Sequence, residues 1–453
     1  MAPDNANYTS KDIATEFLEA FGQHFSSTLK EEISHSKYVS IMADEATDIR
    51  VRQELSLCCR YVNSSGCAKE AFLGLVHLES TTAEVLTQQI IQILKAYNVS
   101  SNQIQWQAYD GAANFSGRKN GVQANMKIHF PDARYIHCRS HLLNLAAVGA
   151  AKNFPMLKKL YSSLNSLWRF FHLSPKRTGK LEAVQQALGS APISLVQAGD
   201  TRWTSNYKAV KAVIATLSAS IVALEDIHQS GDDLSSEAGG LLLTFHDINF
   251  LLLLYAVREI LNPLHILALQ LQSQSLSLAE LPKKVTATVE SLQKIQNDER
   301  TYMEPANVFI EECTSLGLGL IGTPDEQLHA AVIKPYIAKL ITHLGQRLQS
   351  DALNFLSMAY SIFQPTNFQP TMTYGEPEIR LISTEFSLNL EDCLMEWKVY
   401  RNYLKQNMEE TTSTILQKLA SKCDLSDGFP LLHNIACLFL SAPLGTASVE
   451  RSF

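Results

Sequence analysis

Residues 38–49 read YVSIMADEATDI, and residues 104–117 read IQWQAYDGAANFSG. In each stretch an apolar run typical of a buried strand ends in an aspartate, Asp44 in the first and Asp110 in the second. Two further strand-like runs and a helix separate them. This arrangement predicts a sheet that holds two carboxylates side by side, and it decides both the fold and the candidate site.

The periodicity of residues 37–152 extends these two strands into a mixed α/β sheet covered by helices. The pattern predicts five strands, at 38–45, 53–62, 68–78, 104–109 and 134–138. It predicts helices at 82–97, 117–130 and 141–152. The turn-forming residues 63–66, NSSG, join the second and third strands as a hairpin. Antiparallel hairpins followed by helical crossovers are therefore expected.

The rest of the chain is predicted to be helical. At 453 residues it is too long for one core, so two or three domains are expected. Residues 1–36 are a helical lead-in, 37–152 the α/β core, 153–428 an all-α domain, and 429–453 the closing helices. Individual helices are predicted at 207–229, 240–271, 278–296, 327–350, 384–406, 429–440 and 447–453.

The bulk properties are those of a soluble intracellular protein. The first residues are polar, so no signal peptide is expected, and the eight scattered cysteines are expected to be reduced. The most apolar run, at 248–264, meets Arg258, Glu259 and Pro263 too early for a membrane span, which favours a buried helix.

The net charge of −7 argues against a nucleic-acid binder, but its distribution does not. Residues 111–211 contain 15 lysines and arginines and only three acidic residues. Such a block is typical of a phosphate-binding surface, although a solvated helical surface has the same composition. The candidate DNA contacts in this block are Arg118, Lys119, Arg139, Arg202 and Lys208.

Two neighbouring aspartates raise each other's pKa unless a cation lies between them. Mg²⁺ or Mn²⁺ bound by Asp44 and Asp110 would provide that cation and would suit phosphodiester chemistry. The alternative is that each aspartate caps a turn or helix, and Asp110 does precede Gly111. A third acid is needed, and spacing alone does not select it.

Five motifs in this order resemble the hAT superfamily of DNA transposases, in particular its zinc-finger-associated and domesticated branch. They are MADEATDI, AYDGAANFSG, HCRSHLLNLA, DTRWTSNY and LFLSAPLGTASVERSF. The resemblance covers nearly the whole chain. It implies a ribonuclease-H-like fold whose last helix is separated from the sheet by a long all-helical insertion.

The resemblance places the family's DDE triad, which is both its catalytic set and its metal-binding set, on Asp44, Asp110 and Glu450. Without the family motif, Glu450 would be read as a solvent-facing helix acid paired with Arg451. The family's Cys-x-x-His motif falls on Cys138 and His141, which we interpret as structural or DNA-positioning residues. Zinc binding is the weaker reading, because no second ligand pair at finger spacing follows.

Trp203 matches the tryptophan that the family brings to its active site from the insertion. An aromatic ring there can stack on an extruded base, although a tryptophan between helices is also an ordinary core residue. No Gly-rich phosphate loop occurs, so no nucleotide cofactor is expected. Homo-oligomers formed through the C-terminal region and a nuclear location follow from the resemblance.

Two functions remain open at this stage. The first is a DDE-type transposase core that cleaves and transfers DNA strands. The second is a catalytically silent, domesticated nuclear protein that acts through dimerisation and through DNA or partner binding in transcriptional regulation. The three retained acids favour the first. The absence of the family's zinc finger before Lys37 and of its dimerisation region beyond the ERSF string favours the second.

Overall fold

The computed structural model describes the chain except for residues 1–9, 200–202, 232–233, 274–279 and 349–350. It divides into two compact units. The first, here called the sheet unit, comprises Met1–His141, Gln272–Leu281 and Asp351–Phe453. The second, here called the helical unit, comprises Leu142–Leu271 and Pro282–Ser350. Each unit is described by itself.

The sheet unit contains a five-stranded mixed sheet, as the sequence predicts, with strand order β3-β2-β1-β4-β5. The hairpin strands β2 and β3 pair antiparallel with one another, and β2 also pairs antiparallel with β1, whereas β4 pairs parallel with both β1 and β5. The strand bounds are β1 Val39–Thr47, β2 Gln53–Val62, β3 Ala68–Leu78, β4 Ile104–Tyr109 and β5 Arg134–His137.

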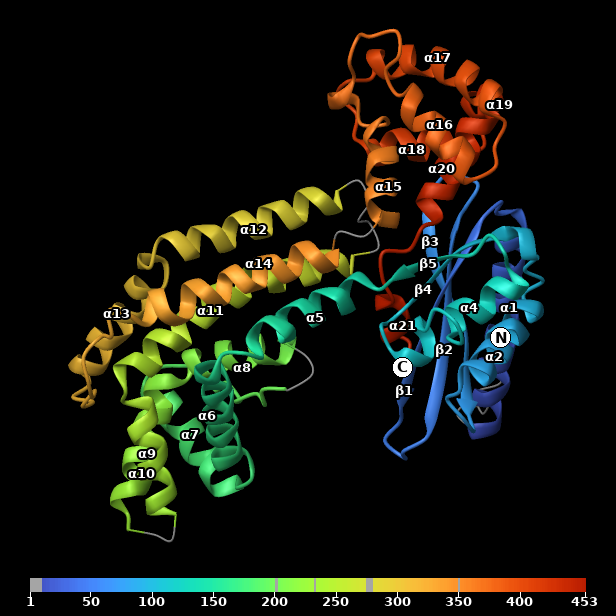
Figure 1. Cartoon of the computed structure of the whole chain (residues 1–453). Helices are drawn as coiled ribbons and strands as arrows, with labels where there is room; N and C mark the ends of the chain where they lie inside the picture. Colours follow the sequence, from blue (N-terminus) through green and yellow to red (C-terminus); the bar gives the residue numbers. More distant parts are fainter. Residues whose placement is uncertain (1–9, 200–202, 232–233, 274–279, 349–350) are drawn as a thin grey trace, which may run out of the picture. The chain divides into compact units, whose positions relative to one another are not determined.

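Three helices cover one face of this sheet (Figure 1): α1 Lys11–His35, α2 Ala83–Ala96 and α4 Val122–His129. Because side chains alternate along a strand, Val39, Ile41 and Ala43 of β1 point into the core beneath these helices, and all three are fully buried. The same core contains Leu86 and Ile90 of α2. The intervening residues of β1 therefore face the other side of the sheet.

The C-terminal segment lies on that other side. Helix α20 spans Pro430–Ser441 and the one-turn helix α21 spans Ala447–Glu450. Ser40 Oγ of β1 donates a hydrogen bond of 2.5 Å to the Ser441 carbonyl, and Trp106 Nε1 of β4 donates one of 3.0 Å to the Leu438 carbonyl. Residues 332 and 401 positions apart in the sequence are thus joined in one unit.

Further helices complete the sheet unit. They are α3 Ala113–Ser116, α15 Asp351–Ser361, α16 Glu376–Glu385, α17 Leu390–Gln406, α18 Thr412–Ala420 and α19 Asp424–Gly428, with short 3₁₀ turns at Ser101–Gln103 and Pro365–Asn367. By compactness, residues 351–428, which the sequence places in the all-α domain, group with the sheet.

The helical unit contains the remaining helices. They are α6 Pro155–His172, α7 Pro175–Ala187, α8 Trp203–Ala215, α9 Leu217–Gln229, α10 Ser235–Phe245, α11 Ile248–Leu271, α12 Leu281–Asn297, α13 Arg300–Ser315 and α14 Lys334–Leu348, preceded by most of α5 Arg139–Ala151. A π-helical turn, His329–Ile333, leads into α14. Among the described helices, α11 alone is long and apolar enough to cross a membrane, and 67% of that window is buried within the chain, as in a core helix.

Several predicted helices are wrong in their bounds. The helix predicted at 207–229 is two helices that meet at Thr216, and the one at 240–271 is broken at His246 and Asp247. The helix predicted at 384–406 is likewise the end of α16 and the whole of α17. Helical spacing continues across each break, so the apolar pattern gives no sign of it.

Gly66 fixes the hairpin turn against α18. Its φ is +74°, and a Cβ atom there would lie 2.1 Å from the backbone oxygen of Gln417. Gly66→Ala is therefore expected to lower the free energy of unfolding by at least about 2 kcal/mol, measured by urea denaturation. Gly22→Ala in α1 is the control, because nothing lies within 4 Å of that position, and it should raise stability by about 0.5–1 kcal/mol. Equal effects of the two substitutions would contradict the packing of the turn.

Candidate active site

The register of β1 and β4 places Asp44 and Asp110 side by side. The two strands run parallel, with Met42 opposite Ala108. Each aspartate follows its residue of that pair by two positions, so both lie on the same face of adjacent strands. Asp110 directly follows β4, whereas β1 continues past Asp44 to Thr47, two residues beyond the predicted end of that strand. This is also the face that the C-terminal segment covers.

Each aspartate also makes a local hydrogen bond to the backbone. Asp44 Oδ1 accepts a hydrogen bond of 2.9 Å from the Glu45 amide, and Asp110 Oδ1 accepts one of 2.9 Å from the Ala112 amide. The turn-capping interaction considered for Asp110 is therefore present. It uses one carboxylate oxygen, and the other remains for a ligand, so the capping role and the site role are compatible.

Helix α21 brings Glu450 towards the same place. It contacts β1, β2 and β3. Ser452 Oγ lies 2.5 Å from Ser56 Oγ, and Ser56 is the cross-strand partner of Asp44. Ser448 of the same turn donates a hydrogen bond to Glu70 in β3. Glu450 itself is exposed, on the short turn between these two anchors.

The acids act on one another electrostatically. The pKa of Asp44 is raised to about 7, first by burial and then by the negative charges of Asp110 and Glu450. Glu45 contributes a further, smaller repulsion. Its Oε1 accepts a hydrogen bond of 2.9 Å from Asn114, whereas its Oε2 is buried with no partner among the described residues. Negative charge is therefore concentrated around Asp44.

No group of three or more His, Cys, Asp or Glu side chains among the described residues is arranged to hold a metal ion. Two of the three predicted ligands, Asp44 and Asp110, each use one carboxylate oxygen on a backbone amide. The chemistry of the donor set nonetheless fits Mg²⁺ or Mn²⁺, since all three side chains offer hard carboxylate oxygens.

Two histidines flank Asp110. His137 and His141 stack with ring centroids 5.5 Å apart. Both rings lie over Gly111, where a Cβ atom would approach His137 Nε2 to 2.8 Å and His141 Nε2 to 2.9 Å. Cys138 is buried between them and accepts a hydrogen bond of 3.3 Å from Thr446 Oγ1. Cys138 therefore links the end of β5 to the C-terminal segment, which agrees with a structural role.

Gly111 leaves no room for a side chain beneath the two imidazoles. Gly111→Ala should displace the histidines and the Asp110 turn, and we expect a loss of about 1–3 kcal/mol in unfolding free energy. Gly74→Ala in β3 is the matched control, because its Cβ would meet Ile93 at an ordinary 3.7 Å. Urea denaturation of both variants tests this, and equal stabilities would contradict the placement of the histidines.

A pocket of about 510 Å³ adjoins Asp110, and its described lining is basic and polar. It is lined by Ser116, Arg118, Gln123, Ala124, Lys127, Tyr135 and His137. Tyr135 donates a hydrogen bond of 3.0 Å from its hydroxyl to the Asp110 carbonyl, which fixes the pocket next to the acids. Its positive side chains suit a phosphate group.

The other predicted DNA contacts differ in their exposure. Arg118 and Lys119 are exposed in the sheet unit, and Lys208 is exposed in the helical unit. Arg139 is only 1% exposed, and burial lowers its pKa to about 10, which weighs against a DNA contact by this guanidinium. Arg202 lies outside the described residues. Trp203 is buried in α8, where its amide donates a hydrogen bond of 3.1 Å to Asn144 Oδ1.

The sequence reasoning missed three residues at this site: Glu45, Lys127 and Tyr135. Glu45 follows Asp44 directly. A second acid in an otherwise apolar strand is a signal from which Glu45 could have been predicted as a site residue. Lys127 and Tyr135 had none, because Tyr135 reaches the Asp110 carbonyl from the neighbouring strand β5 and Lys127 lines the adjoining pocket from α4.

Comparison with known proteins agrees with the sheet. Residues 1–121 match a family model described as DUF4371, the ZMYM1/FAM200, RNase-like domain. The chain is thus a mixed α/β protein, and its first part is similar to a domain described as RNase-like.

Two curated relatives carry the same name, 52 kDa repressor of the inhibitor of the protein kinase. The mouse protein is 22% identical over 419 residues, and the human protein is 23% identical over 418 residues. Each alignment covers 90% of this chain and 52% of the relative. The chain thus spans about half the length of the curated relatives it matches.

Proposed function

We propose that the sheet unit is the catalytic core of a hAT transposase-derived protein, with a ribonuclease-H-like fold interrupted by helical residues, and that it cleaves and transfers DNA strands. The observation that carries this proposal is the register of β1 and β4, which sets Asp44 beside Asp110 under the segment that bears Glu450. The RNase-like match to residues 1–121 and the order of the five motifs support it.

Asp44, Asp110 and Glu450 would hold Mg²⁺ or Mn²⁺. When bound, the cation would supply activation of a water or 3′ hydroxyl and would neutralise charge on the scissile phosphate. Arg118 and Lys127 would hold the neighbouring phosphate in the adjoining pocket. His137 and His141 would position Asp110 from above Gly111. Lys208 would contact DNA from the helical unit, and a nuclear location and oligomerisation through the C-terminal region are part of the same proposal.

A nicking assay on supercoiled plasmid in Mn²⁺ tests the proposed activity without knowledge of the recognised sequence. The wild-type chain is expected to nick, and Asp110→Asn is expected to be at least about a hundredfold slower. Asp132→Asn, at an exposed acid of the same unit, should nick like the wild type. If Asp110→Asn and the wild type behave alike, the catalytic proposal fails.

The second candidate is a catalytically silent regulator that binds DNA or a protein partner. The name of the curated relatives, which describes a repressor, favours it. In that case neither the wild type nor Asp110→Asn nicks plasmid, and both retain the same affinity for DNA in a gel-shift assay.

A further inference from the structure

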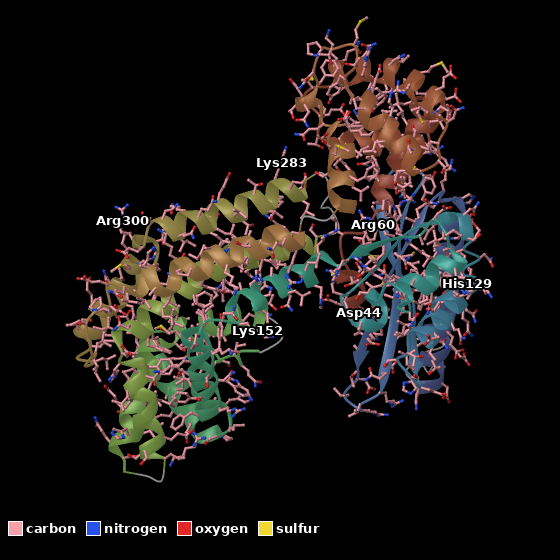
Figure 2. The ribbon with its side chains drawn as sticks, in the orientation of Figure 1. Asp44, Arg60, His129, Lys152, Lys283 and Arg300 are labelled. Carbon is pink, nitrogen blue, oxygen red and sulfur yellow. The ribbon has the colours of Figure 1, made fainter. Side chains whose placement is uncertain are left out.

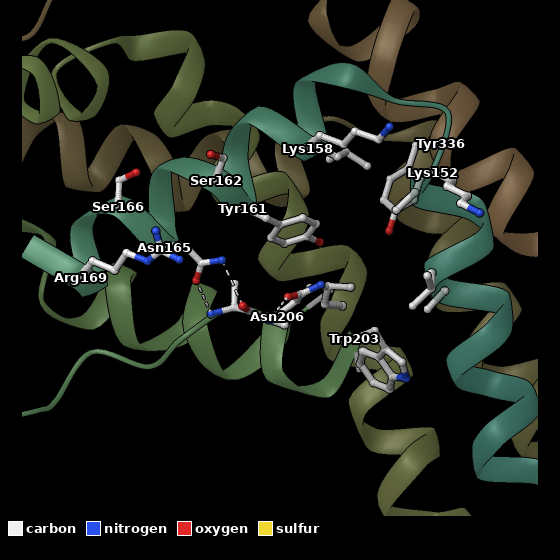
Figure 3. Close-up of a pocket in the computed structure, with 17 residues that line it drawn as sticks. Lys152, Lys158, Tyr161, Ser162, Asn165, Ser166, Arg169, Trp203, Asn206 and Tyr336 are labelled. Carbon is white, nitrogen blue, oxygen red and sulfur yellow. Dashed lines mark hydrogen bonds between the residues drawn. The ribbon is translucent and has the colours of Figure 1, made fainter. Parts of the chain in front are cut away.

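The helical unit contains its own pocket, which the proposed cleavage does not use. Its volume is about 520 Å³, in the range of small-ligand sites, and its walls come from α5, α6, α8, α11, α14 and the chain at 198–199 (Figure 3). All of its lining residues belong to the helical unit.

The mouth of this pocket is cationic. Lys152, Lys158 and Arg169 line it and are exposed, and none of the described residues that line it is acidic. Within the described part of the chain, none of these three cations forms an ion pair. Lys152 and Lys158 lie with Tyr336 at one end of the pocket, and Arg169 lies with Ser166 at the other (Figure 3). The mouth therefore favours an anionic ligand.

The floor is aromatic and apolar. Trp203, Tyr336, Leu157 and Leu261 line it and are buried, and Tyr161 is half-buried beside them. Such a floor suits a flat ring, because aromatic side chains stack on the face of a base. A ring on the floor and an anion at the mouth together describe one nucleotide.

Hydrogen bonds hold the walls in place. Asn165 exchanges two with the backbone of Ala198, of 3.1 Å and 2.8 Å, and Asn206 Oδ1 accepts one of 3.0 Å from the Gly199 amide. The side-chain NH₂ of Asn206 makes no hydrogen bond to another described residue, and it lines the pocket as a donor for a ring acceptor. The site is therefore preformed in the structure.

We propose that this pocket binds a nucleoside monophosphate, with its phosphate at Lys152 and Lys158 and its base against Tyr161 and Trp203. A terminal phosphate carries roughly −1.5 to −2 at pH 7, whereas a phosphate inside a strand carries a single charge, so the cationic mouth favours a terminal phosphate. The absence of a Gly-rich loop predicts no nucleotide cofactor, but this pocket uses side-chain cations in place of such a loop. The ligand is either a free nucleotide or the phosphorylated end of a strand.

Isothermal titration of the full chain with AMP tests the proposal. The wild type is expected to bind AMP at least about tenfold more tightly than adenosine or inorganic phosphate, because each of these offers only half of the contacts. Lys158→Glu should weaken AMP binding at least about tenfold. Lys159→Glu is the matched control, since this exposed neighbour on the same helix does not line the pocket, and it should bind like the wild type.

A 5′-phosphorylated oligonucleotide and its unphosphorylated counterpart identify the source of the nucleotide. Tighter binding of the phosphorylated strand than of AMP assigns the site to strand ends, and tighter binding of AMP assigns it to the free nucleotide. No AMP or 5′-phosphate binding at millimolar concentration, or equal affinity in Lys158→Glu and Lys159→Glu, overturns the proposal. The plasmid-nicking assay does not depend on the outcome of these titrations. Either proposal can therefore fail while the other stands.

Discussion

Asp44→Asn is expected to abolish nicking and, at the same time, to stabilise the metal-free protein at pH 8. The pKa of Asp44 is raised to about 7 by burial and by the charges of Asp110 and Glu450, so ionised Asp44 is unfavourable in the folded state. Asparagine keeps the shape and can still accept the hydrogen bond from the Glu45 amide. The expected gain in unfolding free energy is about 2–4 kcal/mol.

The sign of the pH dependence follows from the direction of the shift. Below about pH 4 the carboxyl is protonated in both the folded and the unfolded state, and it has no effect on the wild type. Between pH 4 and 7 the unfolded chain releases the proton that the folded chain keeps, so wild-type stability falls as the pH rises. Well above pH 7 Asp44 is ionised in both states, and the folded wild type carries the full energetic cost of the buried charge. Urea denaturation in EDTA at pH 4.5, 6 and 8 should therefore show the two proteins diverging with rising pH.

Adding Mn²⁺ provides the complementary measurement. If Asp44 is a ligand, Mn²⁺ should raise the melting temperature of the wild type at pH 8 and leave that of Asp44→Asn almost unchanged. If Asp44→Asn is less stable than the wild type at pH 8 in EDTA, the proposed repulsion between the acidic side chains around Asp44 is contradicted.

Arg60→Met is expected to destabilise the sheet unit by about 3–5 kcal/mol, because it breaks a buried ion pair and leaves one charge behind. Arg60 Nη1 lies 2.8 Å from Glu70 Oε1, and the two side chains are only 8% and 10% exposed. Arg60 Nε also donates a hydrogen bond of 2.9 Å to the Leu440 carbonyl. Figure 2 marks Arg60 and Asp44, both in the sheet. The substitution therefore also frees the segment that carries Glu450, and nicking should fall with stability.

Arg52→Met is the matched control for Arg60. Arg52 pairs with Asp48 at 3.8 Å, and the two side chains are 46% and 31% exposed, so its removal should change the unfolding free energy by less than about 1 kcal/mol. Similar losses in the two variants would show that Arg60 is not buried as described.

The sheet could be predicted from the sequence because its signals are local. The predicted strands at 53–62, 68–78 and 104–109 have the observed bounds, since each is a short run rich in apolar residues that is followed by turn residues or polar residues. The helix predicted at 447–453 is a single turn, α21, that ends at Glu450. The helix predicted at 117–130 begins only at Val122, because Gly117 and Gly121 approach each other within the turn before it.

The exposed face of α1 shows where periodicity is insufficient. Helical spacing predicts one apolar face from Phe17 to Ile33, and the helix is present. Only the C-terminal end of that face is covered: Ile33 is 1% exposed, whereas Phe25 is 68% exposed. Spacing identifies a face, but the position of the neighbouring elements decides how much of it is buried.

The candidate site can be predicted from the sequence only in part. The sequence predicts Asp44 and Asp110, because each aspartate ends an apolar run typical of a strand, but the parallel register that sets them side by side is seen only in the structure. Glu450 required the family motif, since 340 residues separate it from Asp110. The burial of Arg139 could not be read from a basic block, because a Lys/Arg count carries no information on which side of a helix faces the core.

The hydrogen bonds from Ser40 and Trp106 to residues 441 and 438 have a consequence for biosynthesis. During translation the strands emerge from the ribosome hundreds of residues before the C-terminal segment that covers the second face of the sheet. The sheet unit cannot complete its fold until that segment has been synthesised, whereas the helical unit, which is encoded in between, can fold first. Chaperone dependence of the newly made chain should therefore be concentrated on the strands until residues 438–441 have left the exit tunnel.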